Sequence, residues 1–175
     1  PGTAARAALP RLVQLLGDRQ TPDVVARSAA IALGRISGPE DGEIVDILGN
    51  AALHDEDFGT RQFALLAIGR LYERTSSNDE AALRRKSTAQ AFLVDALRRP
   101  THKQQKPYAA LALGLFARGD PTFRSVTAAP ALVGLRVALV DGFADEADPS
   151  VQGAIAIAIG LSGTTDAAAA LRLQL

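Results

Sequence analysis

Two histidines are the side chains of this chain that most readily suggest metal binding. His54 is followed by the acids Asp55, Glu56 and Asp57, whereas His102 stands among lysines and arginines. A zinc-type site needs three or four ligands that converge on one point, and a histidine beside a run of acids in a turn is more typical of solvated charge. The chain has no cysteine, which excludes thiolate ligands and disulfides. The sequence therefore predicts no metal and no cofactor.

The sequence also lacks a recognisable set of catalytic residues. The chain has no cysteine nucleophile, and no serine lies in the strand–turn–helix elbow that exposes the nucleophile in hydrolases. Carboxylate pairs such as Asp141 with Asp145, or Asp145 with Asp148, are spaced to share one helix face, but solvated charge at a helix end explains them. No glycine-rich phosphate loop follows a strand, because no strand is expected. We therefore expect no enzyme activity in this chain.

Charged residues are segregated along the chain, although its 19 basic and 19 acidic side chains cancel overall. Residues 39–57 carry seven acids and no Lys or Arg, residues 84–106 carry seven bases and one acid, and residues 141–148 are acidic again. One interpretation is that the basic block pairs with its acidic neighbours, as exposed charges commonly do. The other is that it binds an acidic protein segment or a nucleic-acid backbone. We favour pairing, and both interpretations stay open at this point.

A repeated six-residue segment organises the chain. It reads Ala-Ala-Ile-Ala-Leu-Gly at 29–34, and close copies follow at 64–69, 109–114 and 155–160. The residue two before the glycine is always Ala, and the residue directly before it is Leu or Ile. The glycines that end the four copies, called the box glycines below, are 35, 45 and 46 residues apart: Gly34, Gly69, Gly114 and Gly160. Self-similarity at such spacing indicates a repeat array.

The repeated segment has a packing explanation. Small Ala residues that alternate with Leu or Ile let neighbouring helices approach closely while branched side chains are buried, and a glycine removes a Cβ where the next unit packs. Glycine costs roughly 1 kcal/mol relative to Ala inside a helix. Four glycines at one register therefore indicate a shared steric need.

The rest of the chain divides into helices, because apolar residues recur at helical spacing between turns that contain Gly, Pro and polar residues. Each helical pair has one apolar stripe too small to be stable alone, so neighbouring units must stack. The predicted fold is all-α, a solenoid of four helical hairpins plus a truncated fifth, and it forms a single array over residues 1–175. We expect the repeats at about 5–38, 39–75, 78–119 and 122–163, with a partial repeat at 164–175.

Other features of the sequence set broader expectations. No apolar run reaches the 18 or so residues that span a bilayer, and none resembles a signal peptide. The chain contains no Met and its last residues continue an apolar helical pattern, so we expect a segment of a longer protein. The cytoplasm is the default expectation for its location, a composition rich in Ala and Arg is typical of GC-rich bacteria, and the oligomeric state stays open.

The fourth unit carries Asp148-Pro149-Ser150-Val151-Gln152 ahead of its glycine segment. This pattern resembles the HEAT repeat family, in the short bacterial form also seen in phycobilin lyases, where an Asp-Pro turn precedes Val-Arg and then Ala-Leu-Gly. The other units depart from it, with Thr60 at the Val position, Lys106 at the Arg position and Arg27 one place late. The resemblance implies an armadillo-like helical fold, a right-handed α–α superhelix whose second helices line a concave groove. It does not imply a particular function.

Curved repeat surfaces generally serve as extended binding sites. We therefore expect a non-catalytic protein–protein interaction scaffold that binds a peptide or an acidic protein surface in the concave groove. The residues expected to contact the partner lie seven or eight positions before a box glycine or one position after it: Arg27, Arg35, Arg61, Gln62, Arg70, Lys106 and Gln152.

Two alternative functions stay open. The basic third repeat offers a surface for a nucleic-acid backbone, and some HEAT-like arrays are DNA glycosylases. Against this, the chain has no Trp, two Tyr and no net charge, whereas base stacking and phosphate tracking require aromatic and basic residues. The array is otherwise an accessory repeat domain of a larger enzyme such as a lyase.

Overall fold

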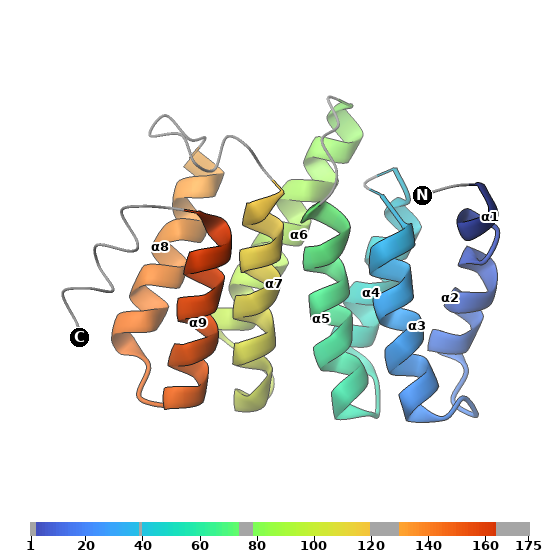
Figure 1. Ribbon diagram of the computed structural model, residues 1–175, viewed down its shortest axis with the longest axis horizontal. Coiled ribbons are helices and arrows are strands. Elements are labelled where there is room, and N and C mark those ends of the chain that lie inside the picture. The colour runs from blue at the N-terminus through green and yellow to red at the C-terminus, as the bar shows by residue number, and fades with distance from the viewer. Residues whose placement is uncertain (1–2, 39, 74–78, 120–129, 164–175) are drawn as a thin grey trace.

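The computed structural model describes residues 3–38, 40–73, 79–119 and 130–163, and within these ranges the chain is helical with no strand (Figure 1). This confirms the all-α prediction. The predicted partial repeat at 164–175 lies outside the described residues. In chain order the helices are α1 (Thr3–Arg6), α2 (Leu9–Gly17), α3 (Asp23–Ile36), α4 (Gly42–His54), α5 (Phe58–Glu73), α6 (Glu80–Arg98), the 3-10 helix η1 (Lys103–Gln105), α7 (Lys106–Arg118), α8 (Pro130–Asp145) and α9 (Pro149–Ser162).

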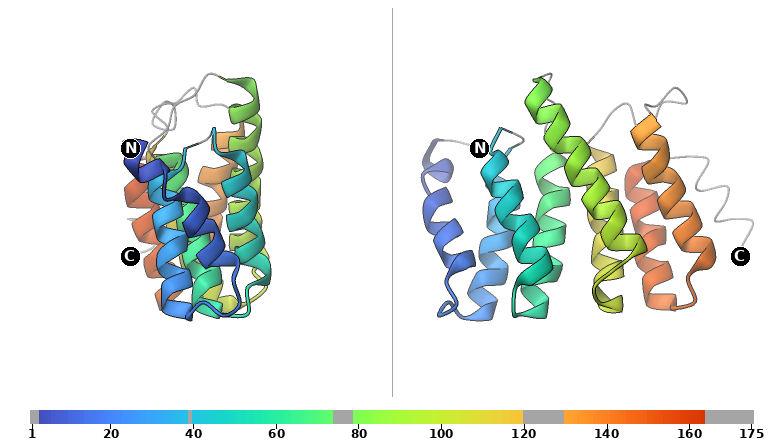
Figure 2. Two further views of the ribbon diagram at one scale, coloured as in Figure 1. Left: turned by 90° about the vertical axis from the view of Figure 1, so that its right-hand side faces the viewer. Right: turned by 180° about the vertical axis from the view of Figure 1, so that it is seen from behind.

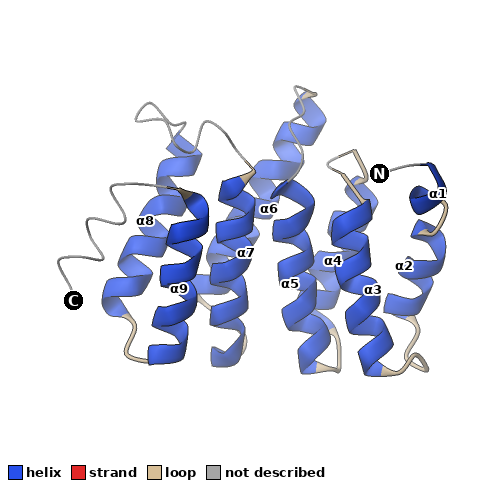
Figure 3. Ribbon diagram, viewed as in Figure 1, coloured by secondary structure: helices blue, strands red, loops and turns tan. Residues whose placement is uncertain are grey.

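The helices form two layers, which are seen edge-on in Figure 2. Helices α3, α5, α7 and α9 stand side by side in one layer, and each packs on the next. Helices α4, α6 and α8 form the other layer, and α2 packs mainly on α3. Each first helix of a pair packs on its second helix, α2 on α3 through to α8 on α9. This succession of packed pairs is compatible with a helical repeat (Figure 3).

Local sequence explains where the helices begin and end. The Asp79 carboxylate accepts a hydrogen bond from the Ala82 amide and caps α6, and Asp148 accepts one from the Ser150 amide at the start of α9. Pro107 lies in the first turn of α7, as its position predicts, because the missing amide hydrogen does least harm there. Gly163 adopts a φ of 69° directly after α9, a left-handed conformation that favours glycine.

Helix α7 differs from the predicted pattern at its start, because η1 precedes it. The Gln105 side chain is buried, and its Nε2 donates to the Ala52 carbonyl oxygen at 3.2 Å. The His102 amide donates to Oε1 of the same side chain at 3.3 Å. These bonds tie the turn before α7 to the end of α4, a contact across 53 residues of sequence that helical periodicity does not encode.

Three of the box glycines, Gly34, Gly69 and Gly114, are points of close contact between neighbouring second helices. A Cβ built on Gly34 would lie 2.6 Å from the Cα of Ala67, and one on Gly114 would lie 2.6 Å from the Cα of Ala158. Gly69 faces Ala112 in the same way, with a corresponding distance of 2.7 Å. The alanine is always the one that stands two residues before the next box glycine. The absence of a Cβ therefore lets each second helix lie directly against the backbone of the next, as the repeated segment predicts.

Candidate partner-binding surface

The second helices leave an apolar stripe exposed on the face turned away from the other layer. The residues directly before the box glycines, such as Leu33 and Leu113, are fully buried. The residues three before the box glycines are not: Ile31 is 39% exposed and Ile157 is 57% exposed, and Leu66 is half-buried. Two residues apart on a helix means a rotation of about 200°, so the two branched positions face opposite sides. The expectation that both are buried is therefore wrong for the earlier one.

Part of this stripe lines a groove between α3, α5 and α7. The groove, called the apolar groove below, has a volume of about 290 Å³. Its lining is mainly aliphatic and aromatic, with two arginines at its edge: Ile31, Arg35, Phe63, Leu66, Ala67, Arg70 and Leu115. The Phe63 ring also packs edge-on against Tyr108 with the ring centroids 6.3 Å apart. The groove thus combines apolar contact area with guanidinium groups.

Two of the residues predicted to bind a partner line this groove. They are Arg35 and Arg70, which stand one position after a box glycine. Arg70 pairs with Glu73 one turn later on α5, and the same carboxylate lies 3.4 Å from the guanidinium of Arg118 on α7. Among the described residues at this end of the second helices, one carboxylate therefore serves two guanidinium groups.

The other five predicted residues stand seven or eight positions before a box glycine. They lie at the opposite end of the second helices, where they contact the turns between helices. Arg27 forms two hydrogen bonds with the Asp57 carboxylate, both 2.7 Å long. Lys106 lies 2.7 Å from Glu146. These ion pairs join a second helix to the turn of the following hairpin, and they hold the pKa of each carboxyl below its usual range, chiefly through the hydrogen bond from the basic side chain.

The remaining predicted residues donate hydrogen bonds to backbone oxygens in the same region. Gln62 Nε2 donates to the Gln104 carbonyl oxygen at 3.2 Å, which links α5 to the turn before α7. Arg61 donates to the backbone oxygen of Asp55, and Gln152 donates to that of Phe143 at 3.4 Å. The structure thus brings Arg35 and Arg70 together at the groove and separates them from the other five predicted residues.

Charge pairing accounts for part of the segregated sequence. Within the basic block, Lys106 pairs with the acidic block at 141–148 through Glu146. Arg84 instead pairs with Glu80 within α6, and Arg99, directly after α6, pairs with Asp95 of that helix. The interpretation as pairing between repeats thus holds for Lys106, while Arg84 and Arg99 pair with acids of α6.

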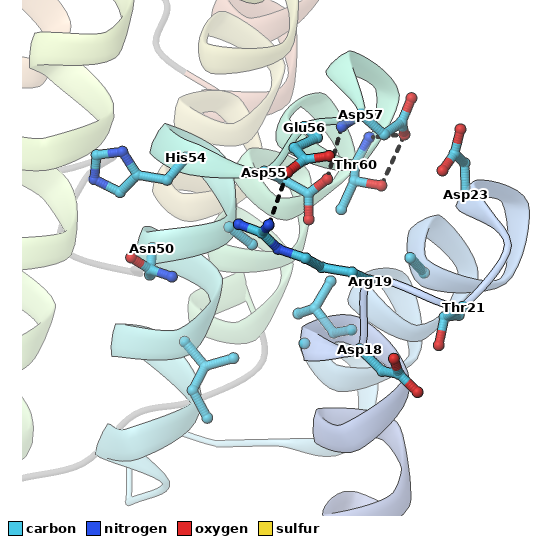
Figure 4. A pocket seen from close by; sticks show the side chains of 15 residues that line it. Asp18, Arg19, Thr21, Asp23, Asn50, His54, Asp55, Glu56, Asp57 and Thr60 are labelled. Atoms are coloured by element: carbon cyan, nitrogen blue, oxygen red, sulfur yellow. Dashed lines mark hydrogen bonds and ion pairs between the residues drawn. The ribbon is translucent and has the colours of Figure 1, made fainter.

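A second cavity, of about 300 Å³, lies at the turns of the first two hairpins and is rich in carboxylates (Figure 4). Arg19 lies 3.3 Å from Glu56 there, and burial raises the pKa of Asp55. Both oxygens of Asp57 are engaged by Arg27, and one also accepts from Thr60. His54 is exposed and its ring points away from the carboxylates. Among the residues that the structure describes, no group of His, Asp and Glu is arranged to hold a metal ion.

The sequence pattern does not predict the apolar lining of the groove. It places Ile31 and Leu66 in the packed core and does not single out Phe63 or Leu115, although a signal for the first two is present. Ile31 and Leu66 stand three before a box glycine, and the 3.6-residue period places that position opposite the buried one. Phe63 and Leu115 carry no comparable signal, because their exposure depends on how the neighbouring helices lie.

In the described ranges, no helix is both long and apolar enough to cross a lipid bilayer. Comparisons of the chain with protein-family models, with curated proteins and with solved structures found no match.

Proposed function

We propose that this chain is a non-catalytic protein–protein interaction scaffold whose second helices bind a peptide segment of a partner protein. The proposal includes a HEAT-like arrangement in which the hairpins follow a right-handed superhelix and the second helices form its concave side. The observation that carries it is the apolar groove, which exposes Ile31 and Leu66 beside the guanidinium groups of Arg35 and Arg70.

The lining of the groove indicates the chemistry of the peptide. Burying an aliphatic or aromatic side chain in such a groove contributes roughly 1.5–3 kcal/mol, and a volume of about 290 Å³ admits one or two such side chains. Arg70 and Arg118 share the Glu73 carboxylate, and a carboxylate of the peptide would be stabilised beside these two guanidinium groups. A segment that combines Leu, Ile or Phe with Asp or Glu fits best.

An array of immobilised peptides tests this proposal. The array pairs apolar residues with Asp or Glu, and each peptide has a matched version in which Lys or Arg replaces the acids. We expect the chain to bind the acidic versions. Ile31→Asp should weaken binding at least tenfold, because it places a charge in the apolar groove, and Arg35→Glu should remove the preference for acidic peptides. Arg84→Glu is the control, since Arg84 is exposed on α6 in the other layer.

Two results would contradict the proposal. One is binding that is unchanged in both groove variants while both remain folded by circular dichroism. The other is a preference for the basic peptides. Loss of binding in Arg84→Glu alone would move the interaction to the basic block and would favour the nucleic-acid alternative, which a gel shift at low salt then checks.

A further inference from the structure

The face of the second helices that carries the apolar groove continues from α5 onto α7. Ile31 and Leu66 stand three positions before a box glycine, and a residue three positions earlier shares their helix face. Phe63 of α5 and Tyr108 of α7 both stand at that earlier position, six before a box glycine. Both are half-buried, and their rings are in edge-on contact. Phe63 lines the apolar groove, so Tyr108 extends the same face beyond it.

Tyr108 also lines another cavity, of about 340 Å³, which is called the polar cavity below. This cavity lies at the turn end of the second helices, where α5, the start of α7 and the start of α9 meet. Pro107, the Tyr108 ring and the buried Val151 form its apolar wall. Its polar side chains come from all three helices and the turn before α7, and they include Gln62, Lys103, Asp148 and Ser150. A peptide that lies along this face therefore reaches the apolar groove and the polar cavity in succession.

The polar cavity offers hydrogen-bonding groups of both signs. Lys103 supplies an ammonium group and Asp148 a carboxylate, and both side chains are exposed. Neither is in an ion pair with a residue that the structure describes. One oxygen of Asp148 accepts a hydrogen bond from the Ser150 amide at 2.8 Å. Within the same described ranges, the hydroxyl groups of Tyr108 and Ser150 form no hydrogen bond. These groups are thus open to a ligand.

A neutral amide side chain fits this lining better than a charged side chain does. A carboxylate in the cavity would be repelled by Asp148, and a Lys or Arg side chain by Lys103. The amide of Asn or Gln donates through its nitrogen and accepts through its oxygen, so it bonds to both charged groups at once. Hydrogen bonds to ionised partners are the stronger ones. The methylene groups of the same side chain lie against Pro107 and the Tyr108 ring.

The distance between the two cavities sets the spacing along the peptide. Leu66 in the groove and Gln62 at the polar cavity are four residues apart on α5. The groove is centred on α5 and the polar cavity on α7, so one interhelical distance and about one helical turn separate them, roughly 10–12 Å in all. An extended peptide covers this distance in about three or four residues.

We propose that the peptide bound in the apolar groove inserts an Asn or Gln side chain into the polar cavity, three or four residues from the side chain that fills the groove. This inference rests on the proposed function, because it concerns the same peptide. It adds a second specificity site, with a ligand of different chemistry, at the other end of the second helices.

A second peptide array tests this proposal. It starts from an apolar and acidic peptide and substitutes Gln, Asn, Ala, Glu or Lys at each position on both sides of the apolar residue. We expect Gln or Asn at the third or fourth position, on one side only, to strengthen binding about fivefold over Ala, the effect of one additional hydrogen bond. Glu and Lys should give no such gain.

Charge variants of the cavity sharpen the test. Lys103→Glu places a second carboxylate beside Asp148, so Lys should become the preferred residue at the same peptide position. Ser150→Lys adds a second ammonium group, so Glu should become the preferred residue there. Arg84→Glu is the matched control, because it makes the same charge change in α6 of the other layer and should keep the preference for an amide. Circular dichroism checks that each variant is folded, and either charge variant alone decides the test.

The other outcomes overturn the inference and separate it from the proposed function. Equal binding with Ala and with Gln at every position overturns it, and the proposed function stands if Ile31→Asp weakens that binding. A preference of the unaltered chain for Glu or Lys at this position also overturns it. A preference for Gln that persists in both charge variants shows that the amide binds outside the polar cavity. Failure to bind any peptide of the array overturns both proposals.

Discussion

The box glycines stand at the same position of their helices but have different neighbours. Gly114 lies against the backbone of Ala158, where a Cβ would come within 2.6 Å of the Cα. Backbone cannot rotate away as a flexible side chain can, so α7 and α9 would have to move apart. At Gly160, no atom of the described residues lies within 4 Å of a Cβ built at the same position. The steric need for glycine therefore comes from the neighbouring helix and not from the helix that contains it.

This difference predicts opposite effects of the same substitution. Gly114→Ala should destabilise the fold by about 1–3 kcal/mol, the usual range for overpacking. Gly160→Ala should leave packing untouched and stabilise the fold by up to about 1 kcal/mol, because Ala has the higher helix propensity. Urea denaturation at low protein concentration measures both free energies of unfolding. If the two variants shift in the same direction, the packing explanation of the box glycines is wrong.

At the scale of helices, ion pairs reinforce the joints that the glycines permit. Arg27 reaches from α3 to Asp57 at the start of α5, and the Asp57 side chain is only 13% exposed. Lys106 reaches from the start of α7 to Glu146 in the same manner. Both pairs lie at the turn end of the second helices, well away from the groove arginines. They align α3 with α5 and α7 with α9 at the end of the helices that the Gly–Ala contact does not reach.

The Arg27–Asp57 pair predicts a pH dependence of stability. The pKa of Asp57 is lowered in the folded state, so the pair contributes fully above the usual carboxyl pKa of 3.8, and its contribution is lost as the pH falls below that value toward the lowered pKa. Arg27→Gln should therefore lower stability at pH 7 and reduce the further loss between about pH 5 and pH 3. Urea titrations of both proteins at these pH values provide the measurement. Parallel pH curves would show that Arg27 does not cause the shift.

At the scale of the whole molecule, the fold is a row in which each hairpin packs mainly on its neighbours (Figure 1). The buried residues form one continuous cluster from Leu16 to Ile159, but it is built from successive thin interfaces. Stability in such an array is close to a sum of unit and interface contributions. A substitution that disrupts one interface between hairpins is therefore expected to destabilise mainly the helices next to it.

Hydrogen exchange checks this expectation. Gly114→Leu places a large side chain between α7 and α9, so amide protection should fall first in α8 and α9 while α3 and α5 stay protected. Gly34→Leu should produce the mirror-image result, with α2 and α3 affected first. An equal loss of protection in all helices of both variants would show that the array unfolds as a single cooperative unit.

The sequence by itself determined the helices, their pairing and the role of the glycine segments. These features depend on the 3.6-residue period, on Pro and Gly in turns and on the steric size of residues within one helix. The burial of Leu33 and the exposure of Ile31 follow from the same period, so that part of the candidate surface was also predictable.

Only the tertiary structure decided which exposed residues act together. Arg27 and Arg35 are two turns apart on α3, yet one joins a neighbouring turn and the other lines the apolar groove. Similarly, Gly114 and Gly160 end similar six-residue segments, but within the described part of the chain only Gly114 has a helix against it. The physical reason is that exposure and pairing depend on atoms supplied by helices some 30 to 45 residues away along the chain, and no local pattern specifies where those atoms lie.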